Sequence, residues 1–172
     1  LFSIPASFGL VIASEEIISG LFGYGSFSKE DTLMTAAALK YFGYGVPAFA
    51  LIKVLSNFFF ARDNTKTPFY ISLLVVLLNV LISVTFFRSI GFLIIPIATS
   101  ISTWAGVIIY LFLLKKNNFL LLNKKLFYNI LKIFISTIVM SFTLLFLLNK
   151  YGDYLDYSFD YKAVYILIIV GI

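Results

Sequence analysis

Long apolar runs, separated by short polar loops, occupy almost the whole chain. Their approximate ranges are 1–22, 33–60, 69–87, 92–114 and 126–148, and a further run begins near residue 163. A helix needs about 20 apolar residues to cross a bilayer, and each complete run approaches or exceeds that length. None of the runs shows the strict alternation of a barrel strand. The pattern therefore predicts an all-α, polytopic transmembrane helix bundle with about six membrane segments.

Both ends of the chain lie inside apolar runs. Position 1 is a leucine, and the chain closes with the letters VYILIIVGI. We therefore expect the first and last segments to be truncated and the chain to be an internal piece of a longer protein.

Capping residues indicate where two of the predicted helices begin. Ser28 and Asp31 have the spacing of a capping box, in which the serine hydroxyl accepts the amide of the third helical residue. Thr67 and Pro68 predict a second start, with threonine as N-cap and proline at the first helical position.

Prolines and small residues predict further features inside the segments. Pro47 and Pro96 lie within apolar runs, where we expect them to kink the helices. Ala98, Ser102 and Gly106 repeat every four residues, which is typical of close helix packing in membranes.

Composition agrees with this class and excludes several others. The chain is 61% hydrophobic and only 12% charged, whereas a soluble domain is about a quarter charged. It contains no Cys and no His, which excludes disulfides, thiol nucleophiles, Ser-His triads and histidine-ligated metals. The sequence pI of about 9.3 does not indicate nucleic-acid binding, because excess Lys and Arg in a membrane protein usually marks cytoplasmic loops.

Counting Lys and Arg in alternate loops predicts the orientation. Loops 61–68 and 115–125 together hold six, whereas loops 23–32, 88–91 and 149–162 hold four. Because positively charged loops stay inside, we place the first two loops in the cytoplasm.

The charged residues within the predicted segments include Glu15, Glu16 and Lys53. Glu15 and Glu16 fit either acids near a helix exit or a proton or cation site. Lys53 lies about two turns from Arg62, so its long stem either reaches the interface or faces a water-filled cavity.

The stretch from Leu21 to Pro68 carries motifs that are specific in both residue type and spacing. In order, they are Leu21-Phe22, Tyr24-Gly25, Phe27, Asp31, Thr35, Lys53-Val54-Leu55, Ala61-Arg62, Asn64 and Lys66-Thr67-Pro68. This stretch closely resembles the MurJ (MviN) family, the lipid II flippases of the multidrug/oligosaccharidyl-lipid/polysaccharide exporter superfamily. Ser28 stands where the family usually has Thr, and Phe60 where Tyr is frequent.

The resemblance implies a fold of fourteen transmembrane helices, of which this chain is similar to helices nine to thirteen and the start of fourteen. Residues 1–114 would then belong to the C-terminal lobe. Residues 115–172 would form a cytoplasmic linker and the two additional C-terminal helices, which in the family form a groove for the lipid tail.

The resemblance also implies a function. Members flip lipid II, a polyprenyl-pyrophosphate-linked precursor, from the cytoplasmic to the periplasmic leaflet of the bacterial inner membrane by alternating access. The family's headgroup-binding arginines fall outside this chain. Within it, the candidate substrate-binding residues are Lys53, Arg62 and Lys66; topology alone also explains Arg62 and Lys66.

The resemblance also implies coupling to cations or to the membrane potential, and this points to a second site. Asn79 and Ser83 share a helix face, and Thr99 lies at similar depth on the antiparallel neighbour, so their oxygens would suit Na⁺. The same residues also suit plain interhelical hydrogen bonding. We expect no organic cofactor, and the oligomeric state is left open.

Three other functions were weighed against the sequence. One is a flippase for another polyprenyl-linked oligosaccharide, or a cation-coupled exporter, of the same superfamily. A membrane-embedded enzyme would need clustered acids at the cytoplasmic face, where Asp63 stands alone. A purely structural scaffold does not explain charged and polar residues within the segments. We therefore expect a transporter of a lipid-linked substrate and not an enzyme.

Overall fold

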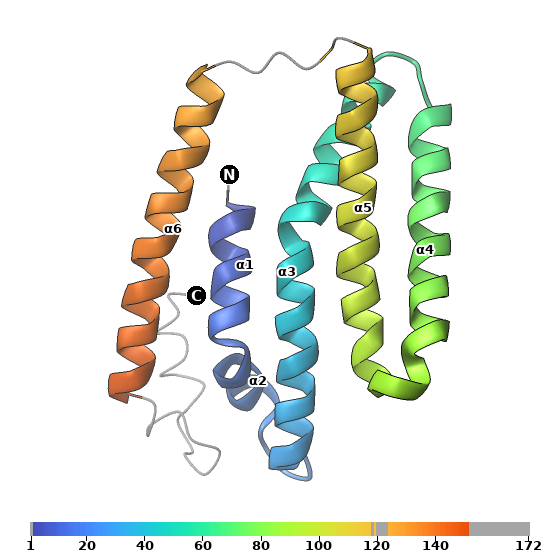
Figure 1. Cartoon of the computed structure of the whole chain (residues 1–172). Helices are drawn as coiled ribbons and strands as arrows, with labels where there is room; N and C mark the ends of the chain where they lie inside the picture. The colour runs from blue at the N-terminus through green and yellow to red at the C-terminus, as the bar shows by residue number, and fades with distance from the viewer. Residues whose placement is uncertain (1, 118, 120–123, 152–172) are drawn as a thin grey trace. The chain divides into compact units, whose positions relative to one another are not determined.

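The computed structural model describes residues 2–117, 119 and 124–151, and this part of the chain is helical with no strand. The helices are α1 (Ser3–Ile12), α2 (Ser14–Phe22), α3 (Lys29–Phe60), α4 (Lys66–Ile90), α5 (Ile94–Lys116) and α6 (Lys124–Tyr151), with a short 3₁₀ turn, η1 (Gly91–Leu93), between α4 and α5 (Figure 1).

Most of these helices are long and apolar enough to cross a membrane. The candidates are Lys29–Phe60, the stretch Lys66–Lys116 and Tyr128–Lys150, together with the bent pair α1 and α2. The stretch Lys66–Lys116 turns back at η1, so it supplies two antiparallel helices. The predicted all-α, polytopic transmembrane class is therefore confirmed. The sixth predicted segment, from residue 163, lies outside the described residues.

The chain divides into two compact units. One comprises Leu1–Gly43 with Leu131–Ile172, and the other is Tyr44–Ile130. The predicted division at residues 114 and 115 concerns the lobes of a larger fold and stays a prediction.

The first unit contains a helix break that the sequence analysis missed. Residues 1–22 were expected to form one segment, but α1 and α2 meet at an angle of 73°. Ala13, between them, has φ −100° and ψ 23°, outside the helical region. The acids at positions 15 and 16 lie in the first turn of α2, where the helix dipole favours negative charge. The letters ASEE thus indicate a new helix start, which the apolar pattern alone conceals.

A proline inside α3 leaves one backbone carbonyl of that helix without its intrahelical partner. Pro47 lies inside α3 and has no N–H, so the carbonyl of Gly43 loses its intrahelical hydrogen bond. The buried hydroxyl of Ser7 donates to that carbonyl at 2.7 Å. This bond is the kind of compensation that makes proline tolerable in a membrane helix.

The two predicted helix starts had different outcomes. The capping box is present: the Asp31 amide donates to Ser28 Oγ at 3.1 Å, and the Ser28 amide donates to Asp31 Oδ2 at 3.0 Å. The second start was wrong, because α4 begins at Lys66 and not after Thr67. Asn64 Oδ1 accepts the Thr67 amide at 3.1 Å, so asparagine satisfies an otherwise free donor of the first turn.

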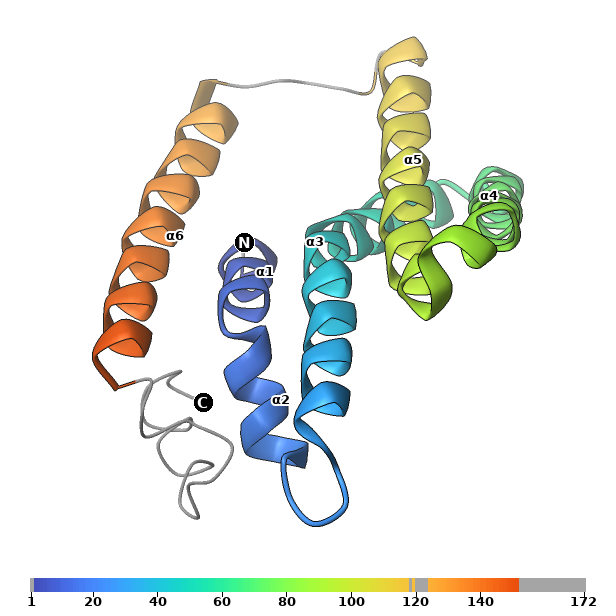
Figure 2. The ribbon, with the colours of Figure 1, turned by 60° about the horizontal axis from the view of Figure 1, so that its bottom comes forward.

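The second unit is built on the α4–α5 hairpin, whose helices lie side by side in both ribbon views (Figures 1 and 2). Gly91 ends α4 with φ 72°, a backbone conformation that side chains disfavour. The small-residue stripe Ala98, Ser102 and Gly106 is buried, as predicted. A Cβ on Gly106 would lie 2.6 Å from Val75 Cγ2, so only glycine permits this approach to α4.

The sequence predicts a kink in α5 at Pro96. Pro96 is the third residue of α5, directly after η1, so it stands in a first turn where its missing N–H costs no hydrogen bond. The expected kink there is wrong. The core of this unit lies at the other end of α5, where Tyr110 and Leu114 pack with Phe59 and Ile71.

Candidate functional site

Lys53, the residue with the strongest predicted role, is exposed on the second half of α3. It makes no ion pair or side-chain hydrogen bond with any residue that the structure describes. Its backbone carbonyl accepts a hydrogen bond from Ser56 Oγ at 3.1 Å, which leaves the ammonium group unaffected. An unpaired lysine on an apolar helix is costly in hydrocarbon unless its ammonium reaches water or an anion. Both sequence-based hypotheses for Lys53 therefore stand.

Arg62, by contrast, is engaged in packing. Its guanidinium carbon lies 4.6 Å from the centroid of the Phe58 ring and 3.8 Å from that of Phe119. The two rings are themselves 5.8 Å apart. These cation–π contacts join the end of α3 to the segment that follows α5. The structure thus gives Arg62 a local stabilising role, and the adjacent Asp63, with φ 56°, a role in ending α3.

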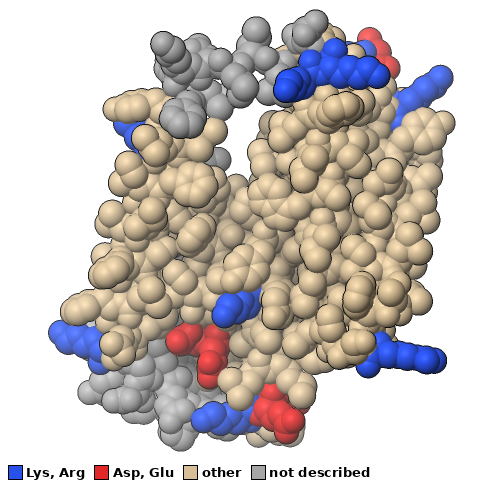
Figure 3. Space-filling model, viewed as in Figure 1, with Lys and Arg blue, Asp and Glu red and all other residues tan. Residues whose placement is uncertain are grey.

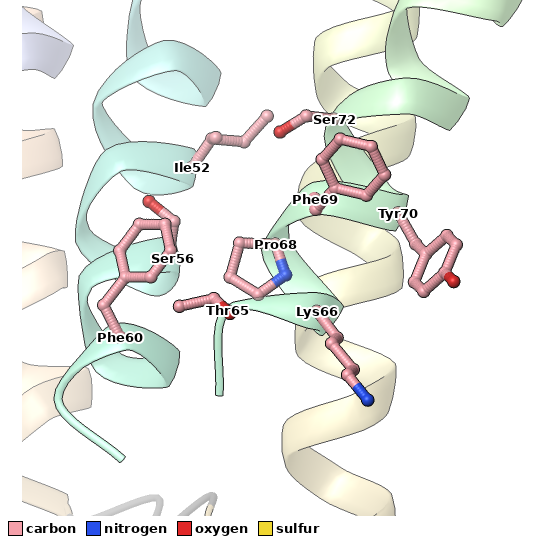
Figure 4. A pocket seen from close by; sticks show the side chains of 9 residues that line it. All are labelled: Ile52, Ser56, Phe60, Thr65, Lys66, Pro68, Phe69, Tyr70 and Ser72. Carbon is pink, nitrogen blue, oxygen red and sulfur yellow. The ribbon is translucent and has the colours of Figure 1, made fainter. Parts of the chain in front are cut away.

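Lys66 lies at one end of a groove between α3 and α4, with a volume of about 680 Å³. Figure 4 shows one wall formed by Ile52, Ser56 and Phe60 of α3, and the facing side chains coming from Thr65 and the first turns of α4. The amino-acid pattern did not predict this groove. The only trace of the groove in the sequence is the presence of polar residues at the start of α4 and of a serine near the end of α3. Many membrane helices carry such residues, so this pattern does not identify a groove.

The predicted cation-binding residues are brought together by the α4–α5 hairpin. Asn79 Nδ2 donates to Thr99 Oγ1 at 2.9 Å, and Ser83 Oγ donates to Asn79 Oδ1 at 3.4 Å. Thr99 Oγ1 also donates to the Ile95 carbonyl at 2.7 Å. All three side chains are half-buried. The cluster offers hydroxyl and amide oxygens but no carboxylate, so cation binding there stays a prediction alongside interhelical hydrogen bonding.

Acidic groups in the described residues do not form a metal site. No three His, Cys, Asp or Glu side chains of this part of the chain lie close enough to share a metal ion. Glu15 is exposed, and Glu16 has a buried Oε2 without a hydrogen-bond partner among the described residues. Both sequence-based hypotheses for these acids, a location near a helix exit and a proton or cation site, stay predictions.

Apart from Lys53, the described charged side chains of the Tyr44–Ile130 unit lie near the ends of its helices. On the face shown in Figure 3, most blue and red atoms lie near the upper and lower ends, and tan atoms dominate the area between them. One end carries Arg62 and Lys66, together with Lys115 and Lys116 in the last turn of α5, whereas Arg88 stands in the last turn of α4 at the other. This asymmetry is the one on which the predicted orientation depends.

Comparison with known proteins extends these observations to nearly the whole chain. Residues 1–165 match the family model described as "Lipid II flippase MurJ". The chain is 34% identical over 170 residues to a probable lipid II flippase MurJ of Thermotoga maritima, which covers 99% of this chain and 33% of that protein. It is 31% identical over 172 residues to the corresponding Borreliella burgdorferi protein, covering 100% of this chain and 33% of the relative.

A solved structure gives the same result in three dimensions. The structure described as lipid II flippase MurJ in the inward closed conformation matches with a TM-score of 0.78 and 30% sequence identity, over 98% of this chain and 34% of the other. The chain therefore spans about a third of the length of these relatives. On the match of 165 residues and on these relatives, the chain belongs to the lipid II flippase MurJ family.

Proposed function

We propose that the protein to which this chain belongs flips lipid II from the cytoplasmic to the periplasmic leaflet of the bacterial inner membrane by alternating access. The observation that carries the proposal is the family match over residues 1–165. The apolar helices of a multi-pass membrane protein support it, as does the similarity to a flippase in an inward closed conformation.

The physical problem that such a protein solves is the transfer of a charged headgroup through hydrocarbon. An unpaired pyrophosphate would have to cross about 30 Å of a medium in which isolated charges are very costly. A cavity that opens first to one side and then to the other replaces that barrier with a solvated, cationic route. In this chain, Lys53 is the proposed contributor to the cationic potential, while Arg62 and Lys66 are proposed chiefly to hold the 61–68 loop in the cytoplasm.

Coupling to Na⁺ or to the membrane potential is part of the same proposal. Asn79, Ser83 and Thr99 are proposed to supply neutral oxygens to the cation. Their half-buried position between two membrane helices supports this, because an ion there is removed from bulk water and depends on protein ligands.

Genetic complementation tests the function directly. The gene that encodes this chain is expressed in a bacterium whose own lipid II flippase is depleted, and growth and accumulation of lipid-linked precursor are measured. We expect growth to be restored and the precursor to return to its normal level. Lack of rescue, with membrane expression verified by immunoblotting, would refute the proposal. A second strain lacks a flippase for another polyprenyl-linked oligosaccharide. If the gene rescued only this second strain, the substrate would be that oligosaccharide and not lipid II.

A further inference from the structure

The groove between α3 and α4 has two chemically different ends. Of the nine residues that line it, only Lys66 is charged, and it stands with Thr65 at the loop end. Ile52 and Ser72 point toward each other at the deeper end in Figure 4. Ser72 follows Lys66 by six residues, so these ends are about 9 Å apart along the helix axis. The groove is thus an amphipathic slot that begins at the membrane interface.

The loop end is suited to a single negative charge. Lys66 is exposed and makes no ion pair with any described residue, and the Thr65 side chain makes no capping hydrogen bond. Both residues stand at the N-terminus of a helix of 25 residues, where the dipole adds positive potential. A phosphate at this position would gain a lysine, a hydroxyl and the helix dipole together.

The deeper part of the groove is suited to a hydrocarbon chain. Ile52, Phe60 and Phe69 contribute apolar walls, and Pro68 forms part of the floor. Phe69 is 64% exposed and Tyr70 65% exposed, so this side of α4 is uncovered by the described protein. Tyrosine side chains such as that of Tyr70 are enriched at the level of the lipid headgroups.

We propose that this groove binds an anionic glycerophospholipid of the surrounding leaflet, with its phosphate at Lys66 and Thr65 and one acyl chain along Ile52, Phe60 and Phe69. The occupant is a resident lipid and not the transported substrate. A phosphodiester carries one negative charge and matches the one lysine. A pyrophosphate carries more charge and would need further cations, but Arg62, the other cation of this loop, already makes cation–π contacts with Phe58 and Phe119.

Native mass spectrometry of the full-length protein tests the headgroup end. The purified protein is incubated with phosphatidylglycerol or with phosphatidylcholine of the same acyl chains, and the retained lipid is counted. We expect retention of phosphatidylglycerol to exceed that of phosphatidylcholine, and Lys66→Gln to lower its retention about fivefold, the effect of roughly one lysine at a lipid surface. Lys115→Gln, an exposed lysine in the last turn of α5, should leave retention unchanged. Equal retention of both lipids, or equal loss in both variants, would overturn the proposal.

A second variant tests the acyl end independently. Ser56→Phe fills the groove with a ring, whereas Ser89→Phe places the same ring at an exposed position near the far end of α4. We expect only the first to lower phosphatidylglycerol retention. An equal amount of undecaprenyl pyrophosphate should not displace the bound phospholipid. Displacement would assign the groove to a polyprenyl substrate and would overturn the choice of occupant, as would unchanged retention in Ser56→Phe.

Discussion

Lys53 and Lys66 are two exposed lysines of the same helical unit with different surroundings. Lys53 lies within a membrane-spanning helix, about two turns from the loop, and Lys66 lies at the loop end of the α3–α4 groove. A charge placed deeper in the span acts through a lower dielectric, so its effect on an anionic substrate is larger.

We therefore expect Lys53→Ala to impair complementation more than Lys66→Ala does. Loss of about 1.4 kcal/mol of substrate interaction would lower binding about tenfold, whereas Lys53→Arg keeps the charge and should retain most function. Growth during depletion of the host flippase, at matched expression, gives the comparison. Equal growth of the two alanine variants would assign Lys53 to an interfacial position reached by its long stem.

The response of the protein to sodium can show whether the cluster of Asn79, Ser83 and Thr99 binds a cation or only joins two helices by hydrogen bonds. If the cluster binds Na⁺ in the folded state, the ion stabilises the full-length protein by about 2.7 kcal/mol at about 100 times its dissociation constant. We expect the thermal midpoint to rise in NaCl relative to choline chloride, and Asn79→Ala to abolish that rise. Thr85→Ala, which removes a hydroxyl bonded within α4 itself, is the matched control. A sodium response that survives in Asn79→Ala would leave the cluster as interhelical hydrogen bonding.

At the scale of elements, the local sequence predicts some helix ends correctly and others not. The Ser28–Asp31 capping box was predictable because its partners are three residues apart and interact wherever a helix starts. The start of α4 was not, because Asn64 and Thr67 are both acceptable caps by residue type. The structure selects Asn64, whose amide both accepts the Thr67 N–H and donates to the Thr67 hydroxyl at 3.0 Å.

The pairing of Ser7 with Gly43 yields a double-variant test. We expect Ser7→Ala to destabilise the protein by about 1 kcal/mol, because a carbonyl that proline left free becomes buried without a partner. In a Pro47→Ala background the restored N–H of residue 47 can serve that carbonyl, so the same serine substitution should cost less. Unfolding of the wild type, both single variants and the double variant gives the coupling free energy. An identical cost in both backgrounds would show that the Ser7 hydroxyl does not compensate for the proline.

At the scale of the whole molecule, orientation in the membrane follows from the charged ends of the helices. The chain has no cysteine, so single cysteines can be introduced at Ser26, before α3, and at Thr65, before α4, in a full-length protein free of other cysteines. In intact cells we expect a membrane-impermeant maleimide to label position 26 and to spare position 65. Both positions are exposed and should react equally in detergent. Labelling of position 65 in intact cells would reverse the assigned orientation.

The sequence alone determined the class, the approximate membrane segments and the family, because each rests on local quantities. Apolar length sets whether a helix can span a bilayer, and closely spaced motifs such as Lys53-Val54-Leu55 and Lys66-Thr67-Pro68 identify a relative without any coordinates. Only the tertiary structure decided which groups meet. It placed Arg62 against two aromatic rings and Ser7 against the Gly43 carbonyl, broke the first segment at Ala13 and formed the groove beside Lys66. The physical reason is that an apolar pattern specifies burial in lipid but not the partner: almost every face of a membrane helix is apolar, so packing and stray polar groups select the contacts.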